Sequence, residues 1–201
     1  MSSGASTKPL DVNPLDGVAW PLHAERLTIR PARVDDSGAL WEYRRLEEVS
    51  RWLTYLPADR VDWDALFTER ERLSRTLVVE RDGEVIGDLF LKVDDGWAQR
   101  EALDQVRNVQ AEIGWCLHPA HSGHGYATEA ARALLRLCFE DLRLRRVQAN
   151  AFADNEASWR LMERIGMRRE IYSVRDSLHR DRGWLDGVSY ALLAEEWARG
   201  I

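Results

Sequence analysis

The sequence predicts a mixed α/β fold, in which helices flank one central sheet. Short apolar runs with strand-like alternation recur along the chain, and Asp82-Gly83 separates two of them as in a β-hairpin. After residue 110, strand-like and helix-like segments alternate, which is typical of strands connected through helices. The predicted order is a strand, two helices, an antiparallel run of strands, a strand–helix alternation and a closing hairpin.

Length and composition indicate one globular domain. The chain has 201 residues, of which 45% are apolar and 31% are charged, so it can bury a substantial core. The formal net charge of −6 argues against a general nucleic-acid-binding protein, because such proteins are usually basic. The same charge is compatible with a cationic substrate or partner.

Cysteine usage and the N-terminus predict a cytoplasmic protein. Cys116 and Cys138 fall in a predicted strand and a predicted helix, where a free thiol packs as a small apolar group. The N-terminus has no apolar signal region, and no window approaches the about 18 uninterrupted apolar residues of a membrane span. We therefore expect neither secretion nor a membrane-spanning segment.

The first half of the chain supplies two predicted helices between strands. Residues 1–16 are rich in Ser, Pro, Gly and Asp and are expected to form a loose arm, followed by a single domain over residues 17–201. The run Leu27–Arg30 alternates and ends at Pro31, which suits a strand. Helical patterns follow from Asp36 towards Trp52 and over residues 63–73, and strands are predicted at 76–80 and 85–93.

The second half alternates strands with helices. Strands are predicted at 111–117, 147–152, 171–174 and 188–193, and a helix opens after Ala127. A short helix over Glu156–Ile165 has Asp154-Asn155 as its cap and Gly166 at its end. The polar insertion at 94–108 could cover the site or mediate a homodimer, and the sequence leaves both open.

The segment Ser122–Ala127 (SGHGYA) is the most informative part of the chain. It joins an apolar strand to the start of a helix, and its glycines allow backbone N–H groups to converge where the helix N-terminus adds partial positive charge. This arrangement suits a phosphate and hence a nucleotide-type ligand. The alternative is a tight strand-to-helix turn that binds nothing.

Other ligand motifs fit this turn poorly. It lacks the Gly-Lys-Ser/Thr ending of a Walker motif and does not complete the dinucleotide pattern Gly-x-Gly-x-x-Gly. The side chains of His118, His121 and His124 resemble a metal cluster, but the sequence offers no matching carboxylate or Cys partners. No metal is expected.

Two motifs resemble those of a known enzyme superfamily. Residues 112–130 (EIGWCLHPAHSGHGYATEA) resemble the acetyl-CoA-binding core of the GNAT N-acyltransferases, and residues 153–167 (ADNEASWRLMERIGM) resemble their second signature. Residues 27–31 (LTIRP) and 186–193 (DGVSYALL), followed by Trp197, are similar to the opening and close of the branch named for ribosomal-protein N-terminal acetyltransferases. The resemblance covers roughly residues 25–198. It implies a GNAT-like, mostly antiparallel sheet of about seven strands with a splayed acyl-CoA cleft.

The resemblance also implies acetyl-CoA, or another acyl-CoA, as co-substrate. The family's pyrophosphate loop falls on the glycine turn, where Ser122 replaces a long polar residue and backbone amides supply most contacts. The residues assigned to this loop are Ser122, Gly123, His124, Gly125, Tyr126, Ala127 and Thr128. Protonated His124 could add a charge-assisted contact, or it is an incidental surface residue.

The pantetheine arm is expected to pair with the strand before the turn. The backbone of Trp115, Cys116 and Leu117 would bond it like an added strand, and the amide of Leu117 is the candidate for polarising the thioester carbonyl. The side chain of Asn155 resembles the residue that bonds the same arm, and it can cap its helix as well. A nucleophilic role for Cys116 would need a partner that the sequence does not identify, so core packing is expected.

Direct acyl transfer needs an acid and a base. Glu112 lies in an otherwise apolar strand, where its carboxylate is either the base or a polar group on a solvated face. Helical spacing turns Ser158 inward with its apolar neighbours, and the resemblance implies that its hydroxyl donates a proton or a hydrogen bond to the departing CoA thiolate.

We expect an acyl-CoA-dependent N-acyltransferase that transfers acetyl to a primary amine by direct attack. The acceptor would be a peptide N-terminus or a small molecule such as an aminoglycoside or a polyamine, since an α-amine with a pKa of about 7.7–8.0 is partly neutral at physiological pH. Another acyl-CoA such as succinyl-CoA, or a non-catalytic acyl-CoA-binding module, are the alternatives. Five aromatic residues are candidates for the acceptor pocket or for the core: Trp41, Trp52, Tyr55, Trp63 and Phe67.

Overall fold

The computed structural model describes residues 13–200. The expected loose arm at residues 1–16 falls largely outside this range. Its described end is a turn, in which the Asp16 N–H donates to the Asn13 carbonyl at 2.9 Å. The side chain of Leu15 in this turn is buried against the core.

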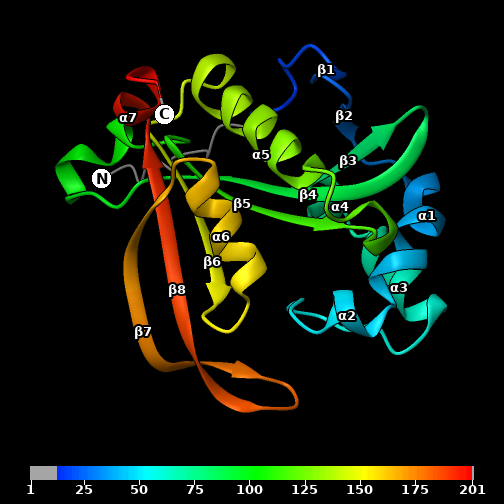
Figure 1. The fold of residues 1–201 in the computed structure, drawn as a ribbon. Coiled ribbons are helices and arrows are strands. Elements are labelled where there is room, and N and C mark those ends of the chain that lie inside the picture. The colour runs from blue at the N-terminus through cyan, green and yellow to red at the C-terminus, as the bar shows by residue number, and fades with distance from the viewer. Residues whose placement is uncertain (1–12, 201) are drawn as a thin grey trace, which may run out of the picture.

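One sheet organises the described chain (Figure 1), and its eight strands lie in the order β1-β2-β3-β4-β5-β6-β8-β7. The strands are β1 Leu22–His23, β2 Thr28–Pro31, β3 Thr76–Arg81, β4 Glu84–Asp94, β5 Gln110–Leu117, β6 Arg146–Phe152, β7 Arg168–His179 and β8 Gly183–Leu193. Every neighbouring pair is antiparallel except β5 and β6, which are parallel. The expected mixed, mostly antiparallel sheet is confirmed, with short β1 as an additional strand.

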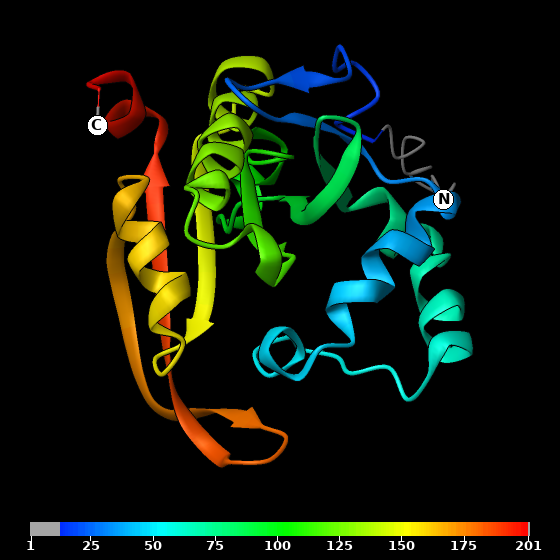
Figure 2. The same cartoon turned by 45° about the vertical axis from the view of Figure 1, so that its right-hand side comes forward.

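Helices cover both faces of the sheet (Figure 2). They are α1 Ser37–Arg44, α2 Glu47–Ser50, α3 Arg60–Phe67, α4 Arg70–Ser74, α5 Tyr126–Arg136, α6 Glu156–Arg164 and α7 Ala194–Ala198. Helices α5 and α6 pack their apolar faces into the larger core, whereas α1 and α3 pack on a second core with Val78 of β3. Leu77 and Val79 of the same strand face the larger core, as the two-residue period of a strand requires.

Three segments differ from the expectation. The helix expected over residues 63–73 is two helices, α3 and α4, because Glu69 between them has a non-helical backbone (φ −56°, ψ 128°). The helix predicted from Asp36 towards Trp52 is broken, because Leu46 adopts an extended backbone (φ −68°, ψ 134°) and packs against the second core. The expected strands at 171–174 and 188–193 are parts of the long β7–β8 hairpin, which extends as far as the Gly183↔His179 pair. Its tip contacts α2, a distant contact that the local sequence pattern does not reveal.

The pairing of β5 with β6 is short. It spans three positions, from Gln110↔Arg146 to Glu112↔Gln148, after which β5 stays with β4 and β6 stays with β8. The two strands therefore separate beyond Glu112 and form a V in the middle of the sheet.

None of the helices in residues 13–200 is long and apolar enough to cross a membrane.

Candidate active site

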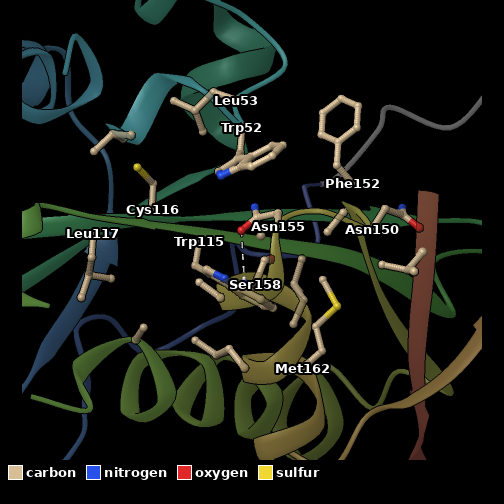
Figure 3. Close-up of a pocket in the computed structure, with 18 of the residues that line it drawn as sticks. Trp52, Leu53, Trp115, Cys116, Leu117, Asn150, Phe152, Asn155, Ser158 and Met162 are labelled. Atoms are coloured by element: carbon tan, nitrogen blue, oxygen red, sulfur yellow. Dashed lines mark hydrogen bonds between the residues drawn. The ribbon is translucent and has the colours of Figure 1, made fainter. Parts of the chain in front are cut away.

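A cavity of about 1080 Å³ opens where β5 and β6 separate. Its wall is built from the open end of β5, the glycine turn, the starts of α5 and α6, the end of β6, the α2 segment and the β7–β8 hairpin. Figure 3 shows Trp52 and Leu53 on one side of this space and Ser158 and Met162 on the other. Segments from most of the chain thus converge on one cavity.

The free edge of β5 presents backbone donors to the cavity. The N–H of His118 donates to the Ile86 carbonyl on β4 at 2.9 Å. N–H directions alternate along a strand, so those of Leu117 and Trp115 point to the opposite side, where β6 has diverged. Both residues line the cavity, and their amides are available to an extended ligand.

The glycine turn leads into α5 at one end of the cavity. Gly123 and Gly125 have φ of +80° and +82°, a left-handed conformation that other residues adopt only at a cost, and α5 begins at Tyr126. The cavity wall includes Ser122, Gly123, Gly125, Tyr126, Ala127 and Thr128. Of the predicted loop residues, His124 is not part of the wall; its ring stacks on that of Tyr126, with centroids 5.5 Å apart.

Helix α6 presents polar groups at its N-terminus. The Asn155 Oδ1 accepts a hydrogen bond from the Ser158 backbone N–H at 3.4 Å, which caps the helix. Asn155, Ser158 and Met162 line the cavity (Figure 3). Met162 follows Ser158 by one helical turn and has no proton to donate, so of these two side chains only the Ser158 hydroxyl can donate one.

Cys116 lines the cavity but is a poor nucleophile. Its side chain packs with the second core, and burial, together with Asp88, raises the pKa of the thiol to about 12, against an opposing effect of Arg44. Almost no thiolate exists at neutral pH under these conditions. The geometry agrees with the expected packing role of this residue.

Glu112 lies at the vertex of the V rather than on the cavity wall. Its carboxylate accepts a hydrogen bond from Asn150 Nδ2 at 3.1 Å, and the Asn150 Oδ1 accepts one from the Ser189 hydroxyl at 2.7 Å. Asn150 and Ser189 both line the cavity. The carboxylate is therefore separated from the cavity by one side-chain layer.

The β7–β8 hairpin closes the side of the cavity opposite the glycine turn. The guanidinium of Arg180 donates to the Ser50 carbonyl at 2.9 Å and to the Leu53 carbonyl. The Asp181 N–H donates to Nδ1 of His179, so the other ring nitrogen, Nε2, carries the proton and donates to the Arg51 carbonyl at 2.9 Å. These bonds join the hairpin tip to the last residue of α2 and to the segment that follows it.

Three aromatic rings lie close together near the tip of the β7–β8 hairpin. Trp52, Phe152 and His179 have ring centroids 5.4–5.9 Å from one another. Of the five aromatic candidates for the acceptor pocket, Trp52 lines the cavity, whereas Trp63 and Phe67 are buried in the second core. Trp41 packs against that core, and Tyr55 is exposed with its hydroxyl bonded to Asp62.

Sequence reasoning did not find several wall residues on this side. These are Glu48, Asn150, Phe152, Asp176 and Ser189. They come from α2, β6, β7 and β8, and no short motif connects them. Strand alternation could have shown that Asn150 and Phe152 share a face of β6, but only a known strand order could have brought the five residues together.

The histidines near the turn do not converge on one point. His118 Nδ1 accepts a hydrogen bond from the Ala120 N–H, and its ring meets that of His121 edge-on at 5.7 Å. Over residues 13–200, no group of three or more His, Cys, Asp or Glu side chains is placed to hold a metal ion.

Comparison with known proteins identifies the family. The model described as "Acetyltransferase (GNAT) domain" matches residues 26–168. The chain belongs to the GNAT acetyltransferase family. Over 174 residues it is 30% identical to the uncharacterized N-acetyltransferase YnaD of Bacillus subtilis (strain 168), a match that covers 86% of this chain and 96% of that protein.

Solved structures of this family share the fold. An acetyltransferase (GNAT family) from Bacillus anthracis is 30% identical, with a TM-score of 0.74 over 88% of this chain and 100% of that one. Mycobacterium smegmatis RimJ, in complex with CoA-disulfide, is 26% identical, with a TM-score of 0.68 over 85% and 83% of the chains. The expected GNAT-type N-acetyltransferase, with its resemblance to the ribosomal-protein acetyltransferase branch, is confirmed at the family level.

Proposed function

We propose that this GNAT enzyme transfers acetyl from acetyl-CoA to a primary amine by direct attack. One observation carries the proposal: the free edge of β5, the glycine turn before α5 and the Ser158 hydroxyl line the same cavity. Backbone amides at a helix N-terminus suit the diphosphate, and an unpaired strand edge suits an extended amide-containing arm. Together they match the successive parts of acyl-CoA.

The reaction follows from this placement. The neutral amine nitrogen attacks the thioester carbonyl carbon, and the N–H of Leu117 donates to the oxygen as negative charge develops. When the C–S bond breaks, the thiolate receives a hydrogen bond from Ser158 and finally one proton, while the nitrogen loses one. The products are the amide and CoA as a thiol.

Glu112 is proposed as the final acceptor of the amine proton. Its carboxylate bonds Asn150 behind the wall, so transfer passes through a water molecule at the vertex of the V rather than by direct contact. This positions the base on the β6 side and the leaving thiolate on the α6 side of the reacting carbon.

The charges of the wall favour acetyl over succinyl. Among the wall residues of the described chain, Arg164 is the one Lys or Arg, and it follows Ser158 by six residues, about 9 Å along α6. A dicarboxylic acyl group would find no cation near the Ser158 end. Glu48 and Asp176 on the opposite side favour an acceptor that carries a second positive charge besides the reacting amine.

The proposal is tested by thiol release with acetyl-CoA and a panel of amines, together with calorimetric titration of CoA. The panel contains peptides with free N-termini, polyamines and aminoglycosides, and succinyl-CoA replaces acetyl-CoA in a second series. Release with at least one amine, faster with acetyl-CoA, is the expected result. Binding of CoA without turnover on any amine would instead indicate a binding module, and no CoA binding at all would refute the proposed donor.

A further inference from the structure

The short turn between β1 and β2 contacts the glycine turn, although the two turns are distant in sequence. Arg26 lies between β1 and β2, in a tight turn closed by the bond from the Ala24 N–H to the Leu27 carbonyl. Its guanidinium and backbone reach across 98 to 103 residues of sequence to the loop and to the first turn of α5. Arg26 is not among the residues that line the cavity.

Three contacts tie Arg26 to successive parts of the loop. Its Nη1 donates to the His124 carbonyl at 3.1 Å, and its guanidinium carbon lies 4.6 Å from the centroid of the Tyr126 ring. Its backbone N–H and its Nε donate to the two carboxylate oxygens of Glu129 at 2.6 and 2.8 Å. Arg26 thus contacts the residue before Gly125, the residue after it and the first turn of α5.

The bond to His124 orients a peptide plane. The carbonyl of residue 124 and the N–H of residue 125 belong to one trans peptide and point in opposite directions. Since the carbonyl points to Arg26, the N–H of Gly125 points away from Arg26, and Gly125 is a wall residue. Arg26 therefore fixes the direction of a backbone donor that belongs to the cavity wall.

The bond to Glu129 controls a charge. A carboxylate in the first turn of a helix is attracted by the same N-terminal partial charge that a bound diphosphate would use. Arg26 engages both oxygens of Glu129, whose side chain is 13% exposed. This neutralises the carboxylate and keeps it bonded on the outer side of the loop.

We propose that Arg26 is a positioning residue for the donor site, which presets the Gly125 N–H and neutralises Glu129 so that the glycine turn binds the diphosphate of acyl-CoA. This inference rests on the proposed use of acyl-CoA. It assigns a role in donor binding to a residue that touches neither the ligand nor the reacting atoms.

Arg81 provides a matched control. Its guanidinium also lies over the Tyr126 ring, at 5.0 Å, and its side chain is 41% exposed compared with 43% for Arg26. Its ion pair is with the neighbouring Asp82, and within residues 13–200 no hydrogen bond joins it to the loop or to Glu129. Arg81→Gln therefore removes the same charge near the same ring, but it leaves the hydrogen bonds from Arg26 to His124 and Glu129 in place.

The experiment compares Arg26→Gln, Arg26→Lys, Arg81→Gln and the double variant Arg26→Gln/Glu129→Gln. CoA affinity is measured by calorimetry, kinetics by thiol release, and folding by thermal unfolding. We expect both Arg26 variants to raise the Kd for CoA and the KM for acetyl-CoA about tenfold or more, the scale on which supporting residues change affinity at a ligand site. At saturating acetyl-CoA, kcat should stay within about twofold, because binding rather than the chemical step is perturbed.

Two comparisons carry the decision. Arg81→Gln should change the Kd much less than Arg26→Gln, and removing Glu129 together with Arg26 should recover part of the lost affinity. Equal weakening by Arg26→Gln and Arg81→Gln would reduce the effect to general charge and overturn the proposal, as would unchanged affinity in both. If Arg26→Gln does not fold, Arg26→Lys decides alone. Failure of the unmodified protein to bind CoA would instead refute the proposed donor itself.

Discussion

Replacement of Ser158 by alanine should slow the reaction without lowering the stability of the protein. The cap of this helix uses the Ser158 backbone N–H, which donates to Asn155, so Ser158→Ala keeps the cap. Alanine also has the higher helix propensity, by a few tenths of a kcal/mol. We therefore expect the free energy of unfolding to stay unchanged or to rise slightly.

The expected kinetic effect follows from the single bond that is lost. Met162, the neighbour on the same face, has no hydrogen-bond donor to replace the Ser158 hydroxyl. A hydrogen bond to a charged group contributes about 1.5–3 kcal/mol, which corresponds to a decrease in kcat of about 10- to 150-fold. The bond strengthens only as the thioester sulfur becomes a thiolate, so the KM for acetyl-CoA should change little.

The assay is the initial rate of thiol release at varied acetyl-CoA with the best amine of the panel. Ala157 also lines the cavity, so the double variant Ser158→Ala/Ala157→Ser returns a hydroxyl to the wall at a different point of the helix. It should not restore kcat. An unchanged kcat in Ser158→Ala, or full recovery in the double variant, would remove the proposed role of Ser158.

The further predictions concern the Arg44–Asp88 ion pair, the Glu112 carboxylate and the two cysteine thiols. Asp88→Ala should lower the free energy of unfolding by about 3–5 kcal/mol, because it leaves the Arg44 guanidinium buried without its carboxylate partner. Denaturant titration should show a smaller loss for Asp88→Asn. A loss below about 1 kcal/mol in Asp88→Ala would contradict the importance of this buried ion pair. Glu112→Gln should lower kcat about tenfold or more with little change in CoA affinity, and an equal kcat would exclude the carboxylate as the base. The thiols of Cys116 and Cys138, whose pKa burial raises to about 12 from 9.0, should resist iodoacetamide at pH 8 in the folded protein. Since the unfolded chain loses these protons first, stability should fall as the pH rises from about 9 to 12, and less so in a Cys116→Ala/Cys138→Ala variant.

Local sequence chemistry was sufficient to predict the conformation of the glycine turn and the start of α6. The glycines at 123 and 125, the helix that follows them and the Asn155 cap each depend on a few contiguous residues, whose backbone preferences act locally. The hairpin at Asp82-Gly83 was predictable for the same reason. The break at Leu46 was not, because packing of that side chain against the second core overrides a helical pattern.

The side of the cavity that α2 and the β7–β8 hairpin line, where we propose that the acceptor binds, depends on contacts between distant segments. The bonds of His179 and Arg180 to the segment after α2 cross more than 120 residues, and they bring Glu48 and Asp176 to one cavity. Strand register and strand order decide which of these distant residues come into contact, and a local sequence pattern predicts neither. The grip of Arg26 on the glycine turn is of the same kind.

The residues alone were enough to predict a mixed α/β sheet and a phosphate-binding glycine turn, because turn, cap and strand preferences are properties of neighbouring residues. The GNAT fold and an acyl-CoA ligand were implied by the resemblance of residues 112–130 and 153–167 to the motifs of that family. The surroundings of that turn depend on contacts between segments that are distant in sequence. The splay of β5 from β6 after Glu112 opens the cavity, the β7–β8 hairpin forms part of its wall and bonds the end of α2, and Arg26 bonds the glycine turn. Each of these requires residues far apart in sequence to meet, and side-chain packing across the whole sheet selects which of them do.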